Sequence, residues 1–154
     1  MAVAPIPQGY HTVTAYLIAN DAARAIEFYK KAFGAEELFR FPMPDGKLGH
    51  AELKIGDSIV MLADAMEGFR DPHAIGGTPV SFMIYVTDVD KVFAQAIAAG
   101  GKELRPAQNQ FYGDRTGTLA DAFGHVWSIA THVEDVSPEE INARHDKYVA
   151  EHKS

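Results

Sequence analysis

Two polar side chains that could do chemistry together are His50 and Glu52. They lie two residues apart in the segment 48–55, where apolar and polar residues alternate as they do in a β-strand. Side chains two apart on a strand share a face, so the imidazole and the carboxylate are expected side by side. Such a pair can carry out acid/base catalysis or supply half of a metal site. The alternative is an exposed or hydrogen-bonded polar pair without a chemical role.

A second set of candidates lies near the stretch Gln110-Phe-Tyr-Gly-Asp-Arg115. Arg115 could hold a carboxylate or phosphate-like group with two parallel hydrogen bonds, or form an internal ion pair with Asp114 or Asp121. Tyr112 could line a binding site or simply pack within its loop. Further along the chain, His125 follows a turn motif and favours a structural role. His132 ends a predicted strand, where it would reach either a cavity mouth or the surface.

The composition excludes several classes of function. The 154 residues carry a formal net charge of −7, and no basic cluster longer than Lys30-Lys31 is present, which argues against nucleic-acid binding. Since the chain has no cysteine, disulfides, thiolate metal sites and cysteine nucleophiles are excluded. The first eight residues do not resemble a signal peptide, and no apolar run is long enough to span a bilayer. We therefore expect a cytoplasmic protein without a membrane partner.

Common catalytic motifs are also missing. The sequence has no Gly-x-Ser-x-Gly elbow, P-loop, His-Glu-x-x-His motif or dinucleotide fingerprint. Hydrolase, kinase, metalloprotease and Rossmann-type functions therefore have no support.

The elements that must position these residues occur twice along the chain. A strand-like run at 13–18 precedes an amphipathic helix that Asn20 or Asp21 can cap and Gly34 can end. A second run at 81–86 precedes a helix opened by Asp88 and closed by Gly100-Gly101. Strand-like segments with matching glycines follow each helix, with Gly49 and Gly56 corresponding to Gly117 and Gly124. The order predicts a duplicated β-α-β-β-β module.

The sequence also suggests where the modules begin and end. The stretch 64–79 contains Asp71-Pro72, Gly76-Gly77 and Pro79, which break regular structure. Ser137-Pro-Glu-Glu140 provides an N-cap, a proline in the first turn and a carboxylate at the third helical position, which predicts a terminal helix over 138–151. We expect an N-terminal arm (1–11), a first module (12–64), a linker (65–80), a second module (81–133), and a C-terminal helix and tail (134–154).

Strand parity sorts the side chains into a helix-covered face and an open face. The predicted core consists of Val13, Ala15, Leu17, Ala51, Leu53, Ile55, Val60, Leu62, Phe82, Ile84, Val86, Trp127 and Ile129. The opposite parity contains Thr14, Tyr16, His50, Glu52, Lys54, Ile59, Met61, Ser81, Met83, Tyr85, Ser128 and Ala130. Apolar walls with a few polar groups are typical of small-molecule sites, whereas the alternative is a solvent-exposed outer face.

Several stretches resemble the vicinal oxygen chelate superfamily, which contains glyoxalases, extradiol dioxygenases and bleomycin-resistance proteins. They are Asp21-Ala-Ala-Arg-Ala-Ile-Glu-Phe-Tyr-Lys-Lys-Ala-Phe-Gly34, Tyr85-Val-Thr-Asp-Val-Asp90 and Asp121-Ala-Phe-Gly-His-Val-Trp127. The stretches Pro42-Met-Pro-Asp-Gly-Lys47 and Gln110-Phe-Tyr-Gly-Asp-Arg115 are similar to the PhnB-like subgroup. The resemblance implies an α+β fold in which two paired βαβββ modules form a cupped, U-shaped mixed sheet. It also implies a homodimer, with the modules paired within one chain or across the dimer.

The resemblance further implies a divalent metal held by four side chains, and here those positions carry Thr14, Met61, Ser81 and Ser128. Hydroxyls and a thioether bind such an ion poorly, so no metal or other cofactor is expected. The first hypothesis is a small-molecule binder whose ligand contacts Tyr16, Met61, Ser81, Met83, Tyr85, Tyr112, Arg115 and Ser128. The alternative is a metal-dependent lyase, isomerase or dioxygenase with a relocated site around His50 and Glu52. The sequence does not decide whether the protein is an enzyme.

Overall fold

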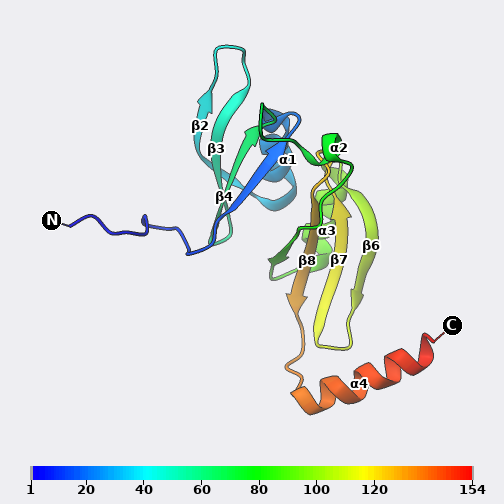
Figure 1. Ribbon diagram of the computed structural model, residues 1–154. Coiled ribbons are helices and arrows are strands. Elements are labelled where there is room, and N and C mark those ends of the chain that lie inside the picture. Colours follow the sequence, from blue (N-terminus) through cyan, green and yellow to red (C-terminus); the bar gives the residue numbers. More distant parts are fainter. Residues whose placement is uncertain (1, 154) are drawn as a thin grey trace.

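The computed structural model describes residues 2–153, which form two β-α-β-β-β modules (Figure 1). Module 1 contains β1 (Ala15–Ala19), α1 (Ala22–Phe33), β2 (Glu36–Pro42), β3 (Leu48–Ile55) and β4 (Ser58–Asp64). Module 2 contains β5 (Ser81–Tyr85), α3 (Val89–Ala98), β6 (Lys102–Asn109), β7 (Asp114–Ala120) and β8 (Val126–His132). The duplicated module and the α+β fold predicted from the sequence are confirmed.

Each module has its own four-stranded mixed sheet with the same strand order. The orders are β1-β4-β3-β2 and β5-β8-β7-β6, so the first strand of each module lies at a sheet edge. In both sheets the edge strand pairs in parallel with the last strand of its module, and the other pairs are antiparallel. Within residues 2–153 no hydrogen-bonded ladder joins the two sheets. The modules are therefore held together by side chains.

The predicted helix ends match the local chemistry. The Asp21 carboxylate accepts a hydrogen bond from the Arg24 backbone N–H and caps α1, as expected of an N-cap aspartate. Gly34 ends α1 at φ 66°, a left-handed conformation that glycine adopts at little cost. Asp88 caps α3 through the Lys91 N–H in the same way. Each capping aspartate therefore starts its helix shortly after the first strand of its module.

One apolar core extends through both modules. Helices α1 and α3 contact each other where the modules meet (Figure 1), and Tyr29 and Phe33 of α1 pack against Trp127 of β8. The buried Asp121 carboxylate accepts hydrogen bonds from the Tyr29 hydroxyl at 2.6 Å and from the Trp127 indole N–H at 2.9 Å. His125 Nε2 lies 2.9 Å from the Ile18 carbonyl oxygen and forms a further tie between the modules.

Two details differ from the sequence predictions. Val13, assigned to the core, is 86% exposed, because β1 begins only at Ala15 and Val13 lies before the sheet. The linker contains a one-turn helix, α2 (Pro72–Ile75), which the proline and glycine content had argued against. Asp71 caps it by accepting from His73 and Ala74, and Pro72 occupies the first turn, where its missing N–H costs nothing.

The C-terminal helix α4 (Pro138–Glu151) begins and ends where the sequence predicts, yet it contains no buried residue. It lies beyond the end of the second sheet (Figure 1). Its ties to module 2 include the Arg144 ion pair with Glu134 at 2.8 Å and the contact between the Tyr148 and Phe111 rings at 5.6 Å. In the described part of the chain, no helix is both long and apolar enough to cross a membrane.

Candidate functional site

The open face of module 1, on the side of its sheet opposite α1, gathers the first candidate residues. Alternation places Tyr16 of β1, Met61 of β4, and His50 and Glu52 of β3 on this face. Tyr16 pairs in register with Met61, and Met61 with Glu52, so these side chains form a row across three strands. The sheet register therefore brings the predicted pair next to an aromatic ring and a thioether.

A chain of hydrogen bonds crosses this face. The Tyr16 hydroxyl lies 2.8 Å from His50 Nδ1, and His50 Nε2 lies 3.0 Å from a Glu52 carboxylate oxygen. The Tyr10 hydroxyl donates to the other Glu52 oxygen. An ionised carboxylate only accepts hydrogen bonds, so Nε2 of a neutral His50 carries the hydrogen and Nδ1 accepts from Tyr16. The chain fixes the tautomer and the orientation of the imidazole.

These contacts also set the charge of the site. Hydrogen bonds from Tyr10 and then from His50 lower the pKa of Glu52, so the carboxylate is ionised at neutral pH. The same bond to Glu52 raises the pKa of Tyr10, and partial burial raises the pKa of Tyr16. Glu52 is thus a fixed negative charge with both oxygens engaged. It can orient His50 or bind a cationic or hydrogen-bond-donating group, but it is a weak base.

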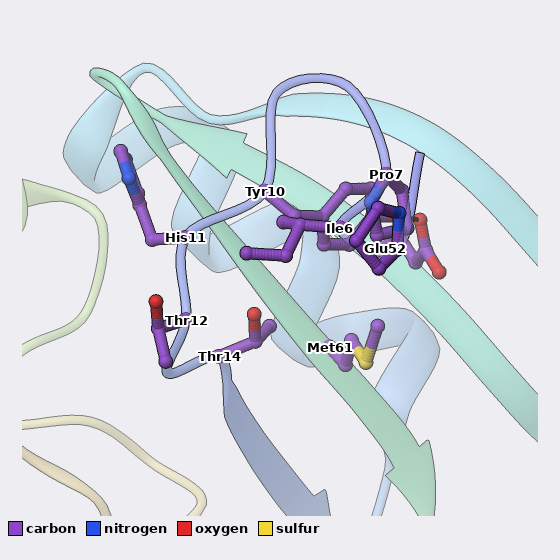
Figure 2. A pocket seen from close by; sticks show the side chains of 9 residues that line it. Ile6, Pro7, Tyr10, His11, Thr12, Thr14, Glu52 and Met61 are labelled. Atoms are coloured by element: carbon purple, nitrogen blue, oxygen red, sulfur yellow. Dashed lines mark hydrogen bonds between the residues drawn. The ribbon is translucent and has the colours of Figure 1, made fainter. Parts of the chain in front are cut away.

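The hydrogen-bond chain is bordered by two cavities. The larger one, about 430 Å³, lies between the N-terminal arm and the sheet (Figure 2). Its lining combines apolar and polar side chains: Pro5, Ile6, Pro7, Tyr10, His11, Thr12, Thr14, Glu52 and Met61. A second cavity of about 210 Å³ adjoins Tyr16 at the other end of β1, beside Met66 and Phe69. The arm therefore forms part of the site.

The candidates on β5 and β8 form a separate group on the open face of module 2. Ser81 and Met83 belong to edge strand β5, and Met83 pairs in register with Ser128 of β8. The Ser128 hydroxyl lies 2.9 Å from that of Thr118. A groove of about 670 Å³ between β1 and β5 is lined by Ser81, Met83 and Tyr85 and reaches Tyr16. Tyr16 is thus the residue that the two groups share.

Arg115 and Tyr112 lie away from both groups. The Arg115 guanidinium forms two hydrogen bonds of 2.9 Å with Asp90 at the start of α3, rather than pairing with Asp114 or Asp121. Parity places Arg115 on the helix-covered face, because its neighbours Asp114 and Thr116 belong to the open face. The Tyr112 ring packs edge-on against Phe111 at 5.3 Å in the loop between β6 and β7. Neither residue borders the cavities described above.

The four positions at which the resemblance implies metal ligands do not fit a divalent ion. Thr14, Met61, Ser81 and Ser128 offer hydroxyls and a thioether, and Ser128 Oγ is hydrogen-bonded to Thr118. Across residues 2–153, no three His, Asp or Glu side chains meet in a group that could hold a metal ion. His50 and Glu52 supply two ligand types at one place, but no third such residue joins them.

Two groups of residues were missed by the sequence analysis. Tyr10 belongs to the arm, where no periodicity links it to Glu52, 42 positions away. On module 2, the buried Asp114 carboxylate accepts from the Tyr85 hydroxyl at 2.8 Å and contacts His132 Nδ1 at 2.7 Å. A signal existed for part of the second group, because His132 was expected at the end of a strand, whereas Asp114 was expected in a loop and instead begins β7, in register with His132.

The fold agrees with the comparison to known families. Residues 10–129 match the family described as the Glyoxalase/Bleomycin resistance protein/Dioxygenase superfamily. The chain belongs to this superfamily. The matched range includes both modules up to β8, together with Tyr10, His50 and Glu52. The superfamily includes both enzymes and resistance proteins, so membership does not define the activity.

Relatives and solved structures support the same assignment. The protein Mb0911c of Mycobacterium bovis is 47% identical over 133 residues, which cover 83% of this chain and 88% of the relative. The structure of TioX from Micromonospora sp. ML1 is similar with a TM-score of 0.65 at 31% identity, covering 80% of this chain and 99% of TioX. The PhnB protein of Bacillus cereus has a similar fold, with a TM-score of 0.61 at 20% identity and coverage of 79% and 99%.

Proposed function

We propose that this superfamily member binds a small molecule on the open face of module 1 without a metal ion. The observation that carries the proposal is the cavity of about 430 Å³ bordered by the hydrogen-bond chain from Tyr10 through Glu52 and His50. Cavities of this size are typical of ligand sites. The hydrogen bonds hold the polar groups in place before a ligand arrives, which reduces the entropy lost on binding.

The lining indicates the chemistry of the ligand. Ile6, Pro7 and Met61 provide apolar walls (Figure 2), and Met61 can adapt to irregular shapes because its side chain is unbranched. Glu52 provides a negative charge at one end of the cavity, and the hydroxyl of Thr14 lies in the lining near Met61. We infer a mainly apolar ligand with one amine or other hydrogen-bond donor directed at Glu52.

A homodimer is part of the proposal. Large apolar side chains stay exposed on both open faces in a single chain, among them Phe39, Phe41, Met83 and Tyr85. Edge strands β1 and β5 each lack a second strand neighbour in the described part of the chain. We propose that the open face of module 1 in one copy faces that of module 2 in another, because this would cover both surfaces and enclose the site. Analytical ultracentrifugation tests it, and a monomer at micromolar concentration contradicts it.

Ligand binding is tested with a cavity-filling variant. Met61→Trp should fill the cavity and abolish the thermal stabilisation that small-molecule hits give the wild-type protein. Lys54→Trp is the matched control, since Lys54 is exposed on β3 outside the cavity lining and should keep the response. A screen of amine-bearing aromatic compounds provides the probes. Hits that stabilise Met61→Trp as strongly as the wild-type protein would place binding elsewhere.

The alternative hypothesis of a relocated metal centre is tested by the same preparation. His50 and Glu52 are hydrogen-bonded to each other, which favours an acid/base or orienting role over joint ligation of an ion. Elemental analysis of the purified protein should find less than stoichiometric divalent metal. About one tightly bound equivalent per chain, lost in Glu52→Gln, would support a lyase, isomerase or dioxygenase of this superfamily instead.

A further inference from the structure

Module 2 carries a second polar cluster that the proposed ligand site does not use. Asp114 of β7 and His132 of β8 are directly opposite each other in the sheet, and the Asp114 carboxylate lies 2.7 Å from His132 Nδ1. Asp114 is only 5% exposed, whereas His132 lies at the surface. The second Asp114 oxygen accepts from the Tyr85 hydroxyl at 2.8 Å. A buried, fully engaged carboxylate therefore holds an accessible imidazole.

This geometry leaves one ring N–H of His132 for a ligand. Both ring nitrogens face carboxylates, which only accept hydrogen bonds, so both carry a hydrogen and the ring is an imidazolium. The partner of Nε2 in the structure is Asp135 at 2.9 Å, whose side chain is fully exposed in the segment between β8 and α4. An exposed ion pair contributes little binding energy. A ligand can therefore displace Asp135 from Nε2.

The groups that face His132 come from three elements: Asp114 of β7, Asp135 of the segment after β8, and Tyr85 of β5 through its bond to Asp114. Their hydrogen bonds, that of Asp114 first, raise the pKa of His132 and so favour its charged form. The same carboxylates repel anions, as does the net charge of −7. A suitable ligand must therefore arrive neutral and lose its proton at the site.

A groove adjoins this cluster at Tyr85. Tyr85 is 62% exposed and lies with Met83 along the groove of about 670 Å³ at the β5 edge. Thr116 lies two residues from Asp114 on the same face, and in residues 2–153 its buried Oγ1 has no hydrogen-bond partner. Buried hydroxyls are nearly always paired, so an unpaired one beside the cluster indicates a place for a polar atom that the chain does not supply.

We propose that the His132 imidazolium, held by Asp114, binds a neutral ligand with a weakly acidic O–H group, such as a phenol, against Tyr85 and Met83 and stabilises its oxyanion. The O–H bond of the ligand breaks, the proton passes to solvent, and the electron pair stays on the ligand oxygen, which replaces Asp135 as the acceptor of the Nε2 hydrogen. The imidazolium is stabilised by the Asp114 carboxylate. None of these residues lines the module 1 cavity.

The test uses para-nitrophenol, whose phenolate absorbs visible light. At a pH just below the pKa of the phenol, wild-type protein should give a saturable increase in phenolate absorbance. His132→Gln should lose this increase, and Asp114→Asn should weaken it, with folding checked by circular dichroism. Asp135→Asn should strengthen it, because the competing partner of Nε2 is removed. The ring pKa of His132, followed by NMR, should fall in Asp114→Asn.

The control is His145→Gln, which alters an exposed histidine of α4 and should leave the phenolate signal unchanged. The proposal is overturned if wild-type protein gives no saturable signal at millimolar phenol, or if His132→Gln retains the full signal. Loss of the signal in His50→Gln together with its retention in His132→Gln would assign phenolate binding to module 1. Because the Met61→Trp test concerns a different cavity, failure of one proposal is distinguishable from failure of the other.

Discussion

At the scale of single residues, the candidate site depends on which donor reaches which acceptor. Glu52 receives hydrogen bonds from Tyr10 and His50, and these two contacts keep it ionised and tie the arm to the sheet. The ordinary alternative, an exposed polar pair, does not describe this arrangement, because both carboxylate oxygens are engaged and the side chain is largely covered. His50 and Glu52 are therefore candidate site residues because Tyr16 and Tyr10 hold them in a fixed orientation.

Removal of the Tyr10 hydroxyl tests this view. Tyr10→Phe should raise the pKa of Glu52, since the hydrogen bond that lowers it most is lost, and lower the free energy of unfolding by about 1 kcal/mol. NMR titration of Glu52 and urea unfolding measure the two effects. Tyr112→Phe, in a loop outside the cavity, serves as the control and should change neither quantity. An unchanged Glu52 pKa in Tyr10→Phe would show that the arm is not bound there in solution.

The pH dependence of stability should carry the sign of each shifted pKa. Glu52 has a lowered pKa in the folded protein, so its stabilising contribution is present above the pKa of an unfolded glutamate and is lost as the pH falls through the folded value. The melting temperature of the wild-type protein should thus fall more on acidification than that of Glu52→Gln. Parallel pH profiles of the two proteins would contradict the prediction.

His132 should behave in the opposite way. Its pKa is raised in the folded protein, mainly by Asp114, so its contribution is complete below the pKa of an unfolded histidine and disappears as the pH rises through the folded value. Melting temperatures of wild-type protein and His132→Gln should differ most in weakly acidic buffer and converge in alkaline buffer. A difference that grows with pH would mean that the neutral ring is the form stabilised by the fold.

At the scale of elements, α4 is the least supported part of the chain. A helix of 14 residues without a buried side chain is marginal in water, because most helical stability in proteins comes from packing of an apolar face. By contrast, α1 buries six residues against the sheets and the second module. The two helices have similar lengths, so a difference in their stability should reflect mainly the tertiary packing that α1 has and α4 lacks.

Hydrogen exchange should distinguish the two helices. Backbone amides of α4 should exchange rapidly, whereas those of α1 should be protected up to the stability of the whole protein. Arg144→Ala should speed exchange in α4 further, since Arg144 pairs with both Glu134 and Glu140. Protection of α4 equal to that of α1 would indicate that a second copy of the chain covers it in solution.

At the scale of the molecule, Asp121 joins the modules. Besides Tyr29 and Trp127, its carboxylate accepts from the backbone N–H groups of Phe123 and His125, so four donors depend on one buried side chain. Burial and the nearby Asp121 charge raise the pKa of Tyr29 well above its ordinary value, which keeps the phenol neutral as a donor. One buried carboxylate therefore links groups of both modules.

Asp121→Ala should weaken this link between the modules. We expect a loss of about 3 kcal/mol in the free energy of unfolding, because buried donors are left without an acceptor, together with a broader or two-step urea transition. The exposed Asp45→Ala is the control and should stay within about 0.5 kcal/mol of wild type. A single sharp transition with unchanged midpoint would show that the apolar contacts of Trp127 suffice to join the modules.

The sequence by itself determined the local features of this protein. The caps at Gly34, Asp88 and Ser137, the duplicated order of elements, and the shared face of His50 and Glu52 follow from residue spacing and backbone preference over a few positions. These interactions join residues close in the chain, so their signals survive in the sequence. The error at Val13 arose at the start of a strand, where the alternating pattern in the sequence begins two residues before the strand pairing does.

Only the tertiary structure decided the longer-range partners. Arg115 pairs with Asp90 rather than with the aspartates nearest to the predicted loop, Tyr10 reaches Glu52 from the arm, and Asp114 is held between Tyr85 and His132. Each of these contacts depends on how strands and helices distant in sequence pack, and several chemically equivalent partners were available to each side chain. Packing selects one of them, which is why the sequence indicated His50 and Glu52 but not the groups that orient them.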